Sequence, residues 1–281
     1  MGKTSIEWTD ESWNPVTGCS KVSPGCANCY AESLTRRFAS TWGVPDLPWT
    51  PENATANVIL HPDRLDQPLR WKRPRMIFVN SMSDLFHELV PDTYIARVFR
   101  VMAQAPQHTF QVLTKRPERM RDLLSNLTWA RLATGAPTPL SNVWLGTSIE
   151  NRRFVGRADA LRQTPAAVRF ISAEPLLGPL VYDCDCGEVP WGHWRGDDAH
   201  EEMPELDLTG IDWLIVGGES GPEHRPMDPQ WARDLRDACW EVDNGRGDAV
   251  AFFFKQWGGA TPKAGGRELD GREWSEMPVT P

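Results

Sequence analysis

Long apolar runs are missing from this chain, which has no stretch of about 18 consecutive apolar residues. A helix needs roughly that length to cross the hydrocarbon core of a bilayer, so we expect no membrane span. The first residues, MGKTSIEWTDESW, also lack the apolar segment of a secretory signal. Ile6 stands where an N-myristoylation site requires serine or threonine. The sequence therefore predicts a cytoplasmic protein with no membrane partner.

Cysteines are few and there is no excess of positive charge. In a reducing cytosol the six cysteines are not expected to form a disulfide framework, and a cluster of them favours metal binding or catalysis. Lysine and arginine total 30 against 38 acidic residues, which gives a formal charge of −8. This acidic balance argues against a broad surface that coats nucleic acid, although nearby charges can still make a local basic groove.

Short apolar runs recur along the chain, with helical patterns such as 91–105 and 228–243 between them. The runs are apolar on both faces rather than alternating, which is typical of parallel strands covered on both sides. With NPVTG (14–18) counted as a first strand, the order predicts repeated β/α units. The six later runs are 75–86, 108–120, 142–151, 168–178, 211–221 and 249–258.

The predicted fold class is α/β, with a partial TIM-type β/α barrel as one domain over residues 1–281. A chain of 281 residues suits this architecture. Residues 183–210 break the alternation with an acidic, glycine-rich segment, which we interpret as an insertion. Residues 259–281 are polar and are predicted to form an irregular tail that folds over the barrel.

The carboxyl end of every predicted strand carries polar residues. In α/β barrels the loops after the strands converge on one face, and this face carries the active site. We therefore expect these side chains to surround one opening. Taken singly, Glu174 or Glu219 fits the N-cap of the next helix as well as it fits a residue of this opening. The residues are Ser81, Asp84, Thr114, Lys115, Ser148, Glu150, Glu174, Glu219 and Lys255.

Three cysteines follow the first predicted strand with the spacing C-x6-C-x2-C: Cys19, Cys26 and Cys29. A structural zinc site would need a fourth ligand from elsewhere, such as His61 or His87. A redox pair would use only the last two cysteines. Three thiolates on an iron–sulfur cluster would leave one iron with an open position. The polar ring at the strand ends favours such a cofactor site over a structural zinc knuckle.

Seven sequence blocks stand out along the chain: WNPVTGCSKVSPGCANCYAE, SMSDLFHE, LTKRPERM, GTSIEN, ISAEPLLGPL, IVGGESG and FFFKQWG. These blocks resemble those of the phage- and prophage-associated three-cysteine-motif proteins, a family regarded as radical-SAM-like. They occur in order between about residues 6 and 258 and cover most of the chain. The opening and the later LTK are also similar to the spore-photoproduct-lyase-like branch of radical SAM enzymes.

The resemblance implies a radical SAM enzyme that modifies or repairs a substrate. In such enzymes three cysteines hold a four-iron, four-sulfur cluster, and S-adenosyl-L-methionine (SAM) chelates the fourth iron. An electron donor then triggers formation of a 5′-deoxyadenosyl radical, which abstracts hydrogen from the substrate. By this resemblance Cys19, Cys26 and Cys29 would be the metal ligands.

The resemblance also suggests roles for the polar residues of the strand ends. Lys115, Glu174 and Glu219 are the predicted catalytic residues. The predicted cofactor-binding residues are Tyr30, Ser81, Asp84, Thr114, Ser148, Glu150, Gly217 and Gly218.

The chain departs from the common radical SAM pattern at three points. The first cysteine gap has six residues rather than three, although a longer loop costs little to close. Asn28 stands before the last cysteine, where an aromatic residue is usual. The GGE at 217–219 follows a late strand, whereas in radical SAM enzymes it follows an early one. Cluster binding is therefore better supported than SAM binding.

Basic residues cluster in 61–75, 114–121 and 150–157. Either these are solvated helix faces or, with Trp71 nearby, they suit a phosphate-bearing substrate such as nucleic acid or a nucleotide. A partner protein encoded by a neighbouring gene is a further expectation.

Other interpretations stay open. One is a binding module in which metal only stabilises the fold, and another is an iron–sulfur lyase that does not use SAM. Cys184 and Cys186, with His193 and His200, would make a second, structural zinc site or are simply exposed.

Overall fold

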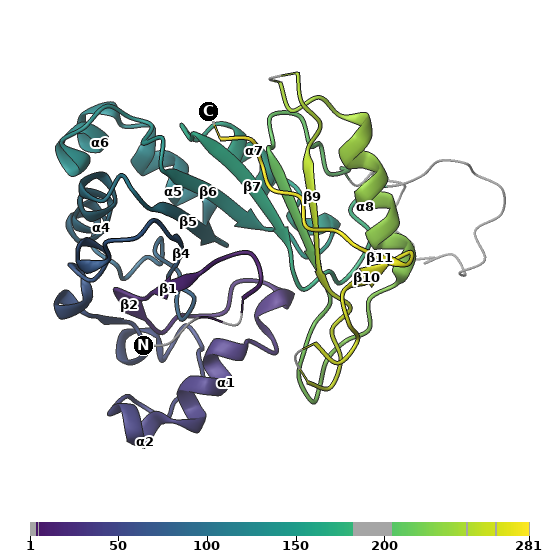
Figure 1. Cartoon of the computed structure of the whole chain (residues 1–281). Helices are drawn as coiled ribbons and strands as arrows, with labels where there is room; N and C mark the ends of the chain where they lie inside the picture. Colours follow the sequence, from purple (N-terminus) through teal and green to yellow (C-terminus); the bar gives the residue numbers. More distant parts are fainter. Residues whose placement is uncertain (1–3, 5, 182–203, 246, 262, 281) are drawn as a thin grey trace.

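Seven parallel strands form the main sheet in the order β1-β4-β5-β6-β7-β8-β9. The computed structural model describes residues 4, 6–181, 204–245, 247–261 and 263–280. Each strand of this sheet lies beside the next sheet strand along the chain, and the sheet curls as a half-barrel with β1 and β9 at its edges (Figure 1). The strands are Glu11–Trp13 (β1), Met76–Val79 (β4), Thr109–Thr114 (β5), Val143–Ser148 (β6), Val168–Ala173 (β7), Trp213–Gly217 (β8) and Ala251–Gln256 (β9).

The six apolar runs predicted as strands each contain one strand of this sheet, so the α/β half-barrel is confirmed. The prediction for the first strand is wrong. Residues 14–18 contain β2 (Val16–Thr17), which pairs antiparallel with β3 (Ile59–Leu60) in a separate small sheet. The first strand of the main sheet is β1, which lies just before residues 14–18. It ends at Trp13, because Pro15 has no N–H with which to continue the strand ladder.

Helices cover the outer, convex face of the sheet (Figure 1). In the predicted helix 91–105, Ile95, Val98 and Met102 are fully buried against the sheet. The Asp228 side chain caps the predicted helix 228–243 by accepting a hydrogen bond from the Gln230 N–H at 2.9 Å. These helices are Asp92–Gln104 (α4), Pro117–Leu124 (α5), Leu127–Thr134 (α6), Arg157–Arg162 (α7) and Pro229–Glu241 (α8).

Aromatic side chains fill the inner, concave face. Trp213 lies among Trp8, Trp144, Phe170 and Phe253, with ring centroids 5.8–6.0 Å away. Successive residues of a strand point to opposite faces, so the same strands supply the larger core under the helices. The half-barrel is therefore packed inside, and its carboxyl edge is where polar groups gather.

Shorter elements surround the N-terminal part of the sheet, and α1 and α2 lie below it in Figure 1. They are the helices Tyr30–Arg37 (α1), Ala39–Trp42 (α2) and Ala54–Asn57 (α3). The 3-10 helices are Pro24–Cys26 (η1), Pro62–Arg64 (η2), Pro68–Arg70 (η3) and Arg152–Phe154 (η4).

The tail predicted to be irregular contains a hairpin of Glu268–Leu269 (β10) and Arg272–Glu273 (β11). It packs on the sheet through the buried Trp274, whose carbonyl accepts the Phe254 N–H at 3.0 Å. The predicted insertion lies mostly outside the described residues, as does the second metal site predicted for Cys184 and Cys186. Among the residues that the structure describes, no helix is both long and apolar enough to cross a membrane.

Candidate functional site

The cysteine loop, residues 18–29, lies at the carboxyl edge of the sheet. The Gly18 N–H donates to the carbonyl of Met82, which follows β4, at 2.9 Å. Cys19, Cys26 and Cys29 are free, partly buried thiols. The three predicted ligands therefore stand beside the strand ends, where the barrel pattern predicted them.

Burial and nearby charges change the pKa values of two of the three thiols. Burial raises the pKa of the Cys19 thiol to about 12, with a further increase from Asp84, while Arg116 lowers it. Burial also raises the pKa of Cys29, and Lys115 acts to lower it. A charge on Cys26 raises the pKa of both other thiols. A metal that bound here would have to displace protons from the thiols.

The donor chemistry of this loop fits an iron–sulfur cluster. In the described part of the chain, no three His, Cys, Asp or Glu side chains are close enough as they stand to hold a metal ion. The Nε2 atoms of His61 and His87, considered as fourth zinc ligands, are 2.8 Å from Thr17 Oγ1 and 2.9 Å from Ser20 Oγ. Both histidines are thus engaged, and three free thiols from one loop remain.

Asp84 joins the ends of β4 and β5. Its carboxylate accepts hydrogen bonds from Thr114 Oγ1 at 2.7 Å, from the Lys115 N–H at 3.0 Å and from Arg116 at 3.2 Å. The structure therefore brings together Asp84 and Thr114, both predicted to bind a cofactor, and their side chains are hydrogen-bonded to each other.

Arg116 is a functional candidate that the sequence did not reveal. Its guanidinium donates to Cys19 Sγ at 3.6 Å and also to the Ser20 side chain at 3.1 Å. The only signal was its place in the basic run 114–121. Its positive charge lies where a cluster held by thiolates would place negative charge.

Two further pairs of predicted residues meet at this edge. The half-exposed Tyr30 donates its hydroxyl to the Ser81 carbonyl at 2.5 Å. Glu174, after β7, forms an ion pair with Lys255 on β9, and both side chains are partly exposed. Glu174 and Lys255 were both expected at strand ends, whereas Tyr30 was suggested by the resemblance and reaches Ser81 from the first residue of α1.

The remaining predicted carboxylates bind arginines that the sequence did not single out. Glu150 is completely buried and pairs with Arg157 at 3.0 Å, and Arg157 also donates to the Ser148 carbonyl at 2.8 Å. Glu219 pairs with Arg225 at 2.5 Å. Although burial acts in the opposite direction, hydrogen bonds from Arg225 and Asn28 keep the pKa of Glu219 below its usual value.

Gly218 permits a close approach between the ends of β8 and β9. A Cβ atom at Gly218 would lie 1.9 Å from the Trp257 carbonyl oxygen, whereas one at Gly217 would lie in ordinary contact, 3.4 Å from the Glu174 side chain. The Gly218 position in the GGE segment thus has a packing reason that is independent of any cofactor.

We expect Gly218→Ala to destabilise the protein by about 3 kcal/mol, because the backbone of Trp257 would have to move. Gly217→Ala is the matched control and should change the free energy of unfolding by less than about 1 kcal/mol. Urea unfolding of both variants without added cofactor measures the difference. Equal stabilities would contradict the packing explanation.

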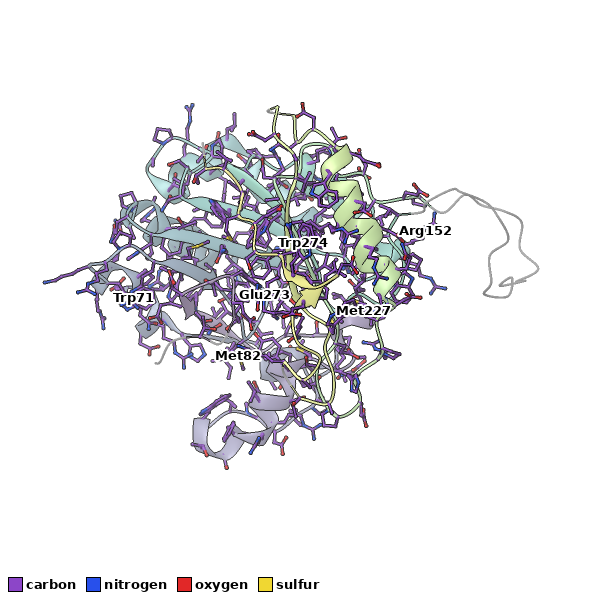
Figure 2. All side chains as sticks on the ribbon, turned by 45° about the vertical axis from the view of Figure 1, so that its right-hand side comes forward. Trp71, Met82, Arg152, Met227, Glu273 and Trp274 are labelled. Carbon is purple, nitrogen blue, oxygen red and sulfur yellow. The ribbon has the colours of Figure 1, made fainter. Side chains whose placement is uncertain are left out.

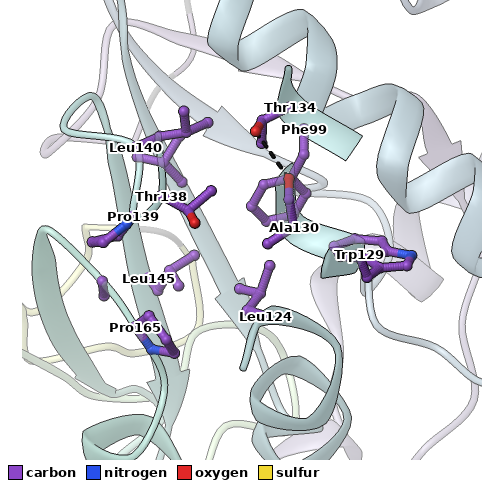
Figure 3. A pocket seen from close by; sticks show the side chains of 12 residues that line it. Phe99, Leu124, Trp129, Ala130, Thr134, Thr138, Pro139, Leu140, Leu145 and Pro165 are labelled. Carbon is purple, nitrogen blue, oxygen red and sulfur yellow. Dashed lines mark hydrogen bonds between the residues drawn. The ribbon is translucent and has the colours of Figure 1, made fainter. Parts of the chain in front are cut away.

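Two cavities lie in the described part of the molecule, and neither is lined by the three cysteines. One of about 150 Å³ is lined by Lys255, Lys263 and Arg267. Each of these cations has a carboxylate partner: Lys255 pairs with Glu174, Lys263 with Glu7 at 2.9 Å, and Arg267 with Glu273 at 3.5 Å. The other, of about 20 Å³, is an apolar gap between α4, α6 and the amino half of β6, lined by Phe99 and Trp129 (Figure 3). Its size admits about one water, so it is a packing gap.

Several arginines of the basic runs form internal ion pairs. Arg75 binds Glu11, Arg119 binds Asp92, and Arg157 binds Glu150. Trp71 precedes β4 and lies away from Met82, which adjoins the cysteine loop (Figure 2). A phosphate-binding role for these runs therefore gains no support from their contacts.

The fold and this edge define a class: a parallel α/β half-barrel with a loop of three free thiols at the carboxyl ends of its strands. The model of the family described as "Protein of unknown function (DUF5131)" matches residues 3–278, and the chain belongs to that family. No curated protein and no solved structure matches the chain.

Proposed function

We propose that this protein is a radical SAM enzyme that modifies or repairs a substrate, with nucleic acid or a nucleotide as the first substrate class to test. The observation that carries the proposal is the set of three free thiols in one loop at the carboxyl edge of a half-barrel. The resemblance of the motifs to phage-associated three-cysteine-motif and radical SAM proteins supports it. So does the polar ring beside the loop.

Cys19, Cys26 and Cys29 would hold a four-iron, four-sulfur cluster and leave one iron open for SAM. With SAM bound and one electron supplied by a donor protein, this group would supply radical chemistry, since reductive cleavage of SAM gives methionine and a 5′-deoxyadenosyl radical able to abstract hydrogen from the substrate. Arg116, which donates to Cys19, would offset the negative charge of the thiolates.

The chain's own residues would orient SAM and the substrate at this edge. Tyr30 and Ser81 are joined on the cysteine-loop side, and we assign them to SAM. Lys115, near Cys29, and the Glu174–Lys255 pair are assigned to the substrate, where the pair can hold or pass a proton.

A metal-stabilised binding module is the second candidate. The loop has only the three-residue helix η1 as regular structure, so metal ligation could contribute strongly to its order. An iron–sulfur lyase that does not use SAM is the third.

Anaerobic purification and cluster reconstitution test the proposal. We expect about four iron and four sulfide per chain, and formation of 5′-deoxyadenosine when SAM and dithionite are added. Stoichiometric zinc in place of iron would overturn the proposal. Iron without SAM cleavage would favour the lyase, and unfolding of the chain on metal removal would favour the binding module.

A further inference from the structure

The cysteine loop has little structure of its own. Between Gly18 and Cys29 only η1 is regular, and its N-cap, Ser23, makes no side-chain capping bond. Three thiolates drawn to one place would also repel one another. The position of the loop therefore depends on contacts from other parts of the chain.

One such contact comes from β6 and the residues that follow it. Glu150 Oε1 accepts the Gly25 N–H at 3.2 Å, while Oε2 accepts a hydrogen bond from Arg157. A Cβ atom at position 25 would lie 3.2 Å from Glu150 Cδ, so the glycine allows this close approach. We call Glu150, Arg157 and Gly25 the inner clamp.

A second contact comes from the segment after β8. Glu219 Oε2 accepts from Asn28 Nδ2 at 3.0 Å, and Asn28 also donates to the Glu223 carbonyl at 2.9 Å. Arg225, which pairs with Glu219, donates to the Pro24 carbonyl at 3.0 Å. We call Glu219, Arg225 and Asn28 the outer clamp.

The two clamps act directly beside the cysteines. Gly25 immediately precedes Cys26, and Asn28 immediately precedes Cys29. Both carboxylates already accept hydrogen bonds from an arginine and from the loop. Each carboxylate oxygen of Glu150 and Glu219 therefore has a hydrogen-bond partner within the protein.

We propose that Glu150 and Glu219 are positioning residues that hold the cysteine loop against the ends of β6 and β8. The purpose of the clamps, to present three thiols to a cluster, rests on the proposed function. The clamps themselves do not require metal, so they can be tested on metal-free protein.

The test is the rate at which iodoacetamide alkylates Cys26 and Cys29 in the metal-free full chain, followed by mass spectrometry. Asn28→Ala and Glu219→Ala should each raise the rate about tenfold, as expected for the loss of one or two hydrogen bonds. Glu150→Ala/Arg157→Met removes the inner clamp without leaving either charge of the pair unpaired. It should raise the alkylation rate by a similar factor. Glu118→Gln, on the exposed surface of α5, is the control and should leave the rate unchanged.

A reversed pair separates positioning from general stability. In Asn28→Asp/Glu219→Gln the glutamine amide can donate to the new carboxylate, whereas the bond from position 28 to the Glu223 carbonyl stays lost. This double variant should therefore regain part of the protection and be alkylated more slowly than either single change, Asn28→Asp or Glu219→Gln. The cluster absorption spectrum of the reconstituted variants gives a second readout, which should differ from wild type in the single variants and approach it in the reversed pair.

The outcomes for the clamps and for the proposed function are distinguishable. Unchanged alkylation in Asn28→Ala and Glu219→Ala would overturn the clamps whatever metal the protein binds. Failure of the reversed pair to restore protection would also count against them. If the wild-type protein binds no iron while the clamp variants are alkylated faster than wild type, the proposed function is overturned and the clamps are supported.

Discussion

Replacing Cys26 with alanine is expected to remove most of the iron that the reconstituted protein binds and to lower SAM cleavage by at least about 100-fold. Cys26 is the middle one of the three thiols, and its charge acts on both of the others. Without it, two thiolates would have to hold a cluster that uses three protein ligands. Iron and sulfide analysis and quantification of 5′-deoxyadenosine measure the effect.

Cys239→Ala is the matched control for this variant. Cys239 is also a free thiol but is buried in the core on α8, away from the cysteine loop, and its loss should leave the iron content unchanged. Wild-type iron content in Cys26→Ala, or equal loss in both variants, would contradict the three-thiol site.

Arg157→Met is expected to destabilise the protein by about 3–5 kcal/mol. The change keeps much of the side-chain volume but leaves the Glu150 carboxylate, which is 0% exposed, without its cation. A buried charge that loses the cation bonded directly to it retains much of its desolvation cost, whereas replacing both partners together is far less costly. We therefore expect Glu150→Gln/Arg157→Met to recover most of the lost stability in urea unfolding.

Arg121→Met provides the comparison for Arg157→Met. Arg121 pairs with Asp122 at 2.8 Å, but the Asp122 side chain is 67% exposed. Removal of such a surface pair should change the free energy of unfolding by no more than about 0.5 kcal/mol. Similar losses in the two arginine variants would show that burial does not govern the Glu150–Arg157 pair.

Most of the main sheet could be predicted because its strands carry a strong local signal. Runs such as IDWLIVGG and AVAFFFKQ are apolar at consecutive positions, since both faces of the sheet are covered. The first strand was misplaced because Glu11–Trp13 is short and partly polar and so gives a weak signal. NPVTG was assigned instead because it directly precedes the cysteines. The hairpin β10–β11 was missed because each of its strands has two residues, too few for a periodic pattern.

The candidate site was predictable as a set of residues at one edge but not as a set of contacts. The parallel strand pattern placed Asp84 beside Thr114 and Glu174 beside Lys255. The pattern gave no reason to select Arg116, Arg225 or Asn28, because each reaches its partner from a loop or a strand end. Such pairing depends on loop paths and side-chain rotamers, which no local sequence period encodes.

The sequence by itself determined the alternation of buried strands and helices, the grouping of polar residues at the carboxyl ends and the presence of three cysteines in one loop. These features follow from short-range patterns of apolar and polar residues, and the order of parallel strands then places their ends together. Only the tertiary structure decided which groups Glu150 and Glu219 bind. Gly25 is 125 positions from Glu150, and Asn28 is 191 positions from Glu219. At such separations, pairing is determined by the packing of the whole chain rather than by neighbours in sequence.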